Sequence, residues 1–119
     1  MNYIDLNTIT VGHVIGKWRV ESRVVGRGSN NNLFSHAKTM ELDNSSYKAK
    51  NGSEYKGEWE VVREKELIYN PQLKFFMDSM QAGNAIITKF LQMDEGDNKT
   101  ELLTLYFSDG LELVLKKDN

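Results

Sequence analysis

The chain has 119 residues, of which 39% are hydrophobic and 27% charged, a balance typical of one globular domain and not of a disordered segment. The 15 basic and 17 acidic side chains are interspersed and give a net charge of −2, which excludes the basic stripe of a nucleic-acid-binding protein and the polybasic patch of a membrane-surface protein. Cysteine is absent, so disulfides, thiol chemistry and cysteine-based zinc sites are excluded.

We expect one domain over residues 1–119, with an N-terminal lead over 1–15 and a barrel over 16–117. The lead lacks the basic region of a signal peptide, and no apolar stretch has the length that spans a bilayer. The compartment stays open, because the sequence as it stands fits the cytoplasm and a removed leader would make the protein secreted or periplasmic. Within the lead, residues 5–15 are predicted to form a short helix that caps the barrel.

Three segments of the first half alternate apolar and polar side chains with a period of two, the pattern of a strand with one buried face. They run from 17 to 24, from 39 to 42 and from 55 to 61. The side chains expected to face inward are Trp18, Val20 and Val24 in the first, Met40 and Leu42 in the second, and Tyr55, Gly57, Trp59 and Val61 in the third. The charged side chains between them, Arg19 and Arg23 included, are expected to face water.

Clusters of glycine, asparagine and aspartate separate the alternating segments and predict turns. They lie at 26–32, 43–44, 51–52, 94–97 and 108–110. The last cluster places Asp109-Gly110 between two leucine-rich alternating runs, which is a strong signal for a β-hairpin. The inward side chains of this hairpin are Leu103, Leu105, Phe107, Leu111, Leu113 and Leu115.

The stretch from 71 to 93 fits two structures. Asn70-Pro71 is a good helix start, and four apolar side chains follow it at helical spacing. Alternatively, 73–77 and 85–93 form two strands joined by a turn at 81–84. The β-branched residues of 86–88 favour the strands.

Short strands with one apolar face each, separated by regular turns, predict an all-β fold. We expect an antiparallel up-and-down β-barrel of about eight strands, because one face in and one face out is what a sheet closed around a core requires.

Gly16-Lys17-Trp18 opens the first strand and resembles the G-x-W motif that begins the barrel of lipocalins. The elements that follow, 40–47, 55–59 and the hairpin over 102–117, resemble in their order the small lipocalin-like, calycin-type domains of bacteria. The resemblance implies a lipocalin-like barrel whose glycine lets the backbone pass close at the mouth and whose tryptophan plugs the closed end. On the last strand, Lys116 and Lys117 stand where lipocalins proper have an arginine that packs over the tryptophan.

No group of residues predicts catalysis, a metal site or a cofactor. His13 and His36 are the only histidines, and neither has a second histidine at metal-binding spacing. The acidic turn at 94–97 lacks the ligand spacing of a calcium loop, and the glycines of 26–28 lack the rest of a phosphate-binding loop. We therefore expect a protein that is not an enzyme and needs neither metal nor cofactor.

The aromatic side chains indicate a binding function, because most of them fall on inward positions. A barrel of eight strands is just wide enough to be filled by its side chains or to hold one small ligand. The leading hypothesis is a small hydrophobic ligand in the barrel interior, with Arg19 or Arg23 steering an anionic head group. The candidate ligand-binding residues are Trp18, Tyr47, Tyr55, Trp59 and Phe107.

The alternative is a protein-interaction or accessory module of the immunity type, whose barrel core is filled. Such a module, or a homodimer, would present apolar side chains on its outside. The candidates for that outer patch are Val25, Leu33, Phe34, Val62 and Ile68.

Overall fold

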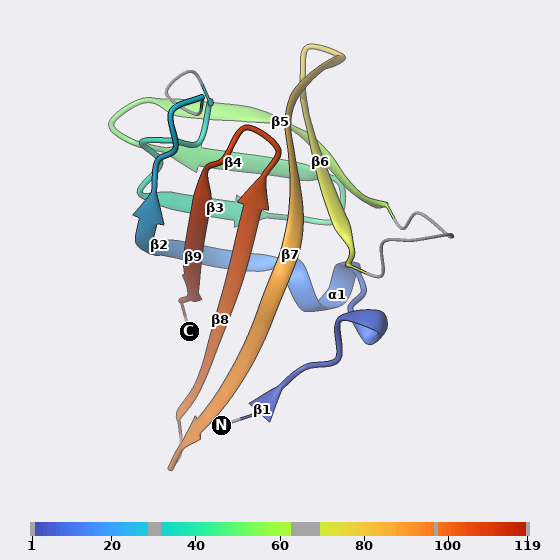
Figure 1. The fold of residues 1–119 in the computed structure, drawn as a ribbon, viewed down its shortest axis with the longest axis vertical. Coiled ribbons are helices and arrows are strands. Elements are labelled where there is room, and N and C mark those ends of the chain that lie inside the picture. Colours follow the sequence, from blue (N-terminus) through green and yellow to red (C-terminus); the bar gives the residue numbers. More distant parts are fainter. Residues whose placement is uncertain (1, 29–31, 63–69, 97, 119) are drawn as a thin grey trace.

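The computed structural model describes residues 2–28, 32–62, 70–96 and 98–118 (Figure 1). The strands of this described chain are β1 (Asn2–Tyr3), β2 (Gly16–Val24), β3 (Thr39–Leu42), β4 (Ser46–Lys50), β5 (Glu54–Val62), β6 (Gln72–Met77), β7 (Met80–Glu95), β8 (Asn98–Phe107) and β9 (Glu112–Lys117). One turn of 3-10 helix (Leu6–Thr8) and the short helix α1 (Val11–Val14) precede β2. None of the described helices is long and apolar enough to cross a membrane.

Strands β2 to β9 form one closed barrel, which confirms the predicted all-β, up-and-down architecture with eight strands. Each strand pairs antiparallel with the next one in the chain, and β9 pairs with β2 to close the ring. The long strand β7 also pairs with β1 through Leu91 and Gln92. Apart from the β1–β7 and β2–β9 pairings, every pairing joins two strands that are consecutive in sequence.

The stretch from 71 to 93, for which the sequence allowed a helix or two strands, forms the two strands β6 and β7, as its β-branched residues favoured. The predicted turn at 81–84 is wrong, however, because the chain turns at Asp78 and Ser79. Both residues have positive φ, 52° and 68°, which is the backbone of a two-residue hairpin whose twist matches that of its strands. Gly83 consequently lies inside β7, opposite Phe75.

The barrel interior holds the side chains that the alternating pattern predicted, with one exception. The inward positions of the terminal hairpin, together with Trp18, Met40, Leu42 and Trp59, are all buried. Val24 is the exception, since its side chain is 63% exposed. An irregularity in the β2–β9 pairing between Val20 and Ser22 shifts the register, so that Arg23 lies opposite the buried Leu113 and Val24 turns outward.

The N-terminal lead closes one end of the barrel (Figure 1). The short helix predicted within 5–15 is present as α1, which is preceded by the 3-10 turn, and the buried side chains of Ile9 and Val14 belong to the core. The indole Nε1 of Trp18 donates a hydrogen bond of 2.8 Å to the Val14 carbonyl, and its ring meets Phe90 edge-on at 6.3 Å. Trp18 thus joins α1 to the barrel wall.

Gly16 allows the last strand to cover this tryptophan. Its φ is +152°, and a Cβ there would lie 2.6 Å from Cε of Lys117. The ammonium of Lys117 lies 5.5 Å from the centre of the Trp18 ring, within the range of a cation–π interaction, and 3.5 Å from the carboxylate of Glu101. A lysine therefore packs over the tryptophan at the closed end.

Candidate functional site

The other end of the barrel is filled by a ring that belongs to a loop. Residues 32–37, called the plug segment below, come from the β2–β3 connection, and Phe34 within it is completely buried. The Phe34 ring centre lies 4.8 Å from that of Phe75, 5.5 Å from Phe107 and 5.6 Å from Tyr47. Three rings supplied by strands thus surround one supplied by a loop.

The plug segment and α1 lie at opposite ends of the barrel, as Figure 1 shows for the connections that carry them. Gly83 of β7 lies against Phe34, whereas Phe90 of the same strand lies against Trp18. Position 90 is seven residues beyond position 83, which corresponds to about 23 Å of strand at roughly 3.3 Å per residue. The barrel therefore has an α1 end and a Phe34 end.

Side-chain hydrogen bonds fasten the plug segment on two sides. Arg23 donates from Nη1 to the Ser35 carbonyl at 2.7 Å and from Nη2 to the Ala37 carbonyl at 2.6 Å. Asn32 donates from Nδ2 to the carboxylate of Asp109 at 3.0 and 3.1 Å, which ties the segment to the β8–β9 turn. These bonds hold the segment, but no strand pairing depends on it.

Tyr47 supplies an unsatisfied polar group at this end of the barrel. Its side chain is 1% exposed, and its hydroxyl has no hydrogen-bond partner among the described residues. Burial raises the pKa of this phenol above its ordinary value, and the negative charge of Glu58 raises it further. A buried hydroxyl without a partner is energetically costly, so a group that supplied one would bind favourably here.

Two glycines make room for these rings. A Cβ at Gly57 would lie 2.8 Å from Cε1 of Tyr47 and would overlap the Phe76 carbonyl oxygen. A Cβ at Gly83 would lie 3.2 Å from the Phe34 ring and 3.3 Å from that of Phe107. The absence of a side chain at these two glycines therefore leaves the space that the aromatic rings of the Phe34 end occupy.

The five residues predicted to form the ligand site do not converge on one point. Tyr47 and Phe107 meet at the Phe34 end, whereas Trp18 lies at the α1 end. Trp59 is buried and donates from Nε1 to the Asp43 carbonyl at 2.7 Å, so its polar atom holds the β3–β4 turn. Tyr55 is half-buried opposite Ala49.

Sequence reasoning missed the two residues that define the Phe34 end. Phe34 was a candidate for the outer patch of the alternative function and is fully buried, and Arg23 was expected outside and lies on the inward side of β2. The sequence does contain a signal for the burial of Phe34, because it is a large apolar residue in a loop rich in glycine and asparagine. The other residues of the expected outer patch differ in exposure: Val25 is exposed, Leu33 and Val62 are half-buried, and Ile68 lies outside the described residues.

Two of the shallow hollows on the outside of the barrel lie over neighbouring strands. One, of about 200 Å³, lies between β7 and β8, and Tyr106 beside it is 44% exposed. Its lining residues are Asn84, Ala85, Ile86, Tyr106 and Ser108. The other, also about 200 Å³, lies on β2 to β4 and is lined by Lys17, Trp18, Thr39, Met40, Glu41, Lys48, Lys50 and Asp118.

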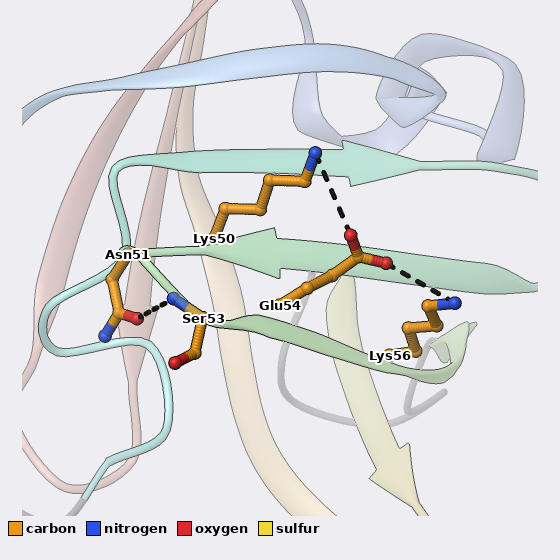
Figure 2. A network of polar contacts seen from close by, with 5 residues as sticks. All are labelled: Lys50, Asn51, Ser53, Glu54 and Lys56. Atoms are coloured by element: carbon orange, nitrogen blue, oxygen red, sulfur yellow. Dashed lines mark hydrogen bonds and ion pairs between the residues drawn. The ribbon is translucent and has the colours of Figure 1, made fainter.

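The β4–β5 hairpin beside the second hollow carries only solvent-exposed polar contacts (Figure 2). The carboxylate of Glu54 lies 3.8 Å from the ammonium of Lys50 and 3.4 Å from that of Lys56. Asn51 Oδ1 accepts the backbone N–H of Ser53 at 3.3 Å and shapes the turn. Both lysine side chains are more than half exposed, so these ion pairs contribute little to stability and form no enclosed charge site.

Neither histidine belongs to a cluster of metal ligands. His13 accepts the Thr10 backbone N–H on Nδ1 at 3.0 Å and meets Phe90 edge-on, while His36 is exposed. Within the described ranges, no three histidine, aspartate or glutamate side chains converge as a metal site would require. Among the described residues, the Phe34 end is therefore the strongest candidate for a binding site, because it combines buried aromatic rings with an unsatisfied hydroxyl.

No family model, curated protein or solved structure matches this chain significantly.

Proposed function

We propose that this chain is a non-enzymatic, lipocalin-like binding domain that takes a small hydrophobic ligand at the Phe34 end of its barrel. The observation that carries the proposal is that the ring filling this end belongs to a loop and not to a strand. A loop-borne ring can leave while all eight strands keep their pairing. Its departure would expose an apolar space lined by Tyr47, Phe75 and Phe107.

The chemistry of that space suits a ligand about as large as one aromatic ring. Burial of its apolar surface would drive binding, and offset or edge-on packing against the three rings would add to it. The Tyr47 hydroxyl, which has no partner within the described chain, would supply one hydrogen bond and with it a preferred orientation.

The packing at the α1 end supports the lipocalin-like part of the proposal. In lipocalins proper an arginine of the last strand lies over the tryptophan of the G-x-W motif. Here Lys117 lies over Trp18, and Gly16 leaves the room that its side chain needs.

Titration with indole, cyclohexanol and octanol, followed by NMR and thermal unfolding, tests the proposal. We expect at least one compound to shift the signals of residues 32–37 and of the Tyr47 ring and to raise Tm, because a ligand that binds only the folded state stabilises it. Shifts confined to Tyr106 and Ile86 would place binding on the outer surface and contradict the proposal. So would an unchanged Tm with all three compounds.

A protein-interaction module with a filled barrel is the second candidate, and a specific observation favours it. Tyr106 is 44% exposed beside Ile86 on the outside of the barrel, and exposed tyrosines are enriched at protein interfaces. Under this alternative, including a homodimer, Tyr106→Lys would abolish association in analytical ultracentrifugation or pull-down. The same variant would leave binding of the three small compounds unchanged if the first proposal holds.

A further inference from the structure

We infer that the ligand is a small ring-bearing carboxylate, whose ring replaces Phe34 and whose carboxylate replaces the plug-segment carbonyls on Arg23. This inference rests on the proposed function and deepens it. The plug segment acts as an internal substitute for the ligand, since it places a ring in the barrel and, within three residues of that ring, two acceptor oxygens on Arg23.

Arg23 is placed to receive a carboxylate because of the irregularity in β2. The shift between Val20 and Ser22 brings its side chain to the inward side, opposite Leu113. Its two terminal nitrogens each donate to a carbonyl, of Ser35 and of Ala37, at 2.7 and 2.6 Å. When the segment leaves, both donors lose these partners together.

A carboxylate fits this pair of donors better than two separate carbonyls do. The planar guanidinium matches a carboxylate with two parallel hydrogen bonds, and such charge-assisted bonds are roughly twice as strong as neutral ones. The exchange therefore replaces two neutral acceptors with one anionic, bidentate acceptor. An alcohol of the same shape would gain the ring contacts and forgo this advantage.

The plug segment also sets the apparent affinity. The ligand binds only molecules whose segment has opened, so the measured Kd equals the intrinsic Kd divided by the open fraction. Asn32 and Asp109 fasten the segment at the β8–β9 turn, away from the Arg23 contacts. Weakening that contact is expected to tighten binding of any ligand that needs the open state.

Isothermal titration with 3-phenylpropanoate and with 3-phenylpropan-1-ol tests both parts of the inference. We expect the wild-type protein to bind the carboxylate at least about tenfold more tightly than the alcohol. Arg23→Gln should reduce this preference to less than twofold. Arg23→Lys should reduce it in part, because lysine keeps the positive charge but lacks the two parallel N–H donors of the guanidinium. Arg19→Gln is the matched control, an outward arginine of the same strand, and should keep the full preference.

Two further readouts follow the segment itself. Asn32→Ala should tighten binding of both compounds several-fold, and the Phe34 ring signals should move toward solvent-exposed values as the carboxylate is added. Equal affinity for the two compounds, a preference unaffected by Arg23→Gln, or a Phe34 ring that stays buried in the bound state would overturn the inference. In those cases the proposed function would stand. Failure of the wild-type, Arg23→Gln and Asn32→Ala proteins to bind either compound at millimolar concentration would also overturn the inference. The proposed function would fall with it only if indole, cyclohexanol and octanol all left Tm unchanged.

Discussion

Removing the hydroxyl of Tyr47 is expected to stabilise the protein, which is unusual for a change in a barrel core. The hydroxyl is buried without a partner among the described residues, so Tyr47→Phe removes a desolvated polar atom and breaks no hydrogen bond. The ring keeps its contacts with Phe34 and Phe75, at 5.6 and 5.3 Å between centres.

The magnitude follows from the cost of an unsatisfied buried group. That cost is about 1–3 kcal/mol, and loss of the packing made by one oxygen offsets part of it. We therefore expect the free energy of unfolding to rise by about 1 kcal/mol at neutral pH. For a domain of this size, such a change corresponds to a Tm increase of roughly 3–6 °C.

The advantage of the variant should grow at alkaline pH. The pKa of Tyr47 in the folded protein lies above its ordinary value of about 10, mainly through burial and secondly through Glu58. Above pH about 10 the unfolded chain therefore releases this proton first, and the wild-type protein loses stability until the folded-state pKa is passed. This loss amounts to at most about 1.4 kcal/mol per pH unit and is absent from Tyr47→Phe.

Urea unfolding of the wild type and Tyr47→Phe at pH 7 and at pH 10–11 measures both effects. Tyr106→Phe is the control at pH 7, where loss of an exposed hydroxyl should change the free energy of unfolding by less than about 0.5 kcal/mol. If Tyr47→Phe loses 1 kcal/mol or more at pH 7, the hydroxyl has a partner and the reasoning is refuted.

Three further substitutions test the packing. Gly57→Ala should lower the free energy of unfolding by about 3 kcal/mol or more, because the alanine methyl group would overlap the Phe76 carbonyl oxygen of the neighbouring strand. A loss below about 1 kcal/mol in urea unfolding would contradict this steric overlap. Phe34→Ala should cost about 3–5 kcal/mol by the same measurement, as for other buried rings, whereas a loss near zero would mean that the plug segment does not pack as described. Lys117→Met should lower the free energy of unfolding by about 1 kcal/mol, because the variant loses the contacts with Trp18 and Glu101. Added salt should reduce the difference in Tm between the variant and the wild type. An equal effect of Lys116→Met would show that these contacts are not the cause.

The strands of the barrel could be predicted from sequence because each one carries its own evidence. Alternation over 55–61 and the Asp109-Gly110 turn express local geometry, and the structure follows both. The Asp78–Ser79 turn was missed, because positive φ is usually predicted from glycine and neither of these residues is glycine. Local signals therefore fixed the strands better than the position of each turn.

The Phe34 end could not be predicted for two physical reasons. A one-residue irregularity exchanges the two faces of a strand, and nothing in the composition around Val20 signals it, so Arg23 was assigned to water. The position of Phe34 depends on contacts with three distant strands, and a loop has no periodicity from which its burial follows. Tyr47 and Phe107 were found because they lie on regular strands.

The closure of the barrel between its first and last strands has a consequence for how the chain folds. Trp59 bonds to a carbonyl only 16 residues away, so its surroundings can form within the local meander of β3 to β5. Trp18 meets Lys117 only when β9 reaches β2, and this contact closes a loop of nearly the whole barrel sequence. Closing so long a loop is entropically expensive unless the intervening strands are already ordered. The chain's two tryptophans therefore report on different stages of folding, and variants that keep only one of them would separate formation of the meander from closure of the ring in stopped-flow fluorescence.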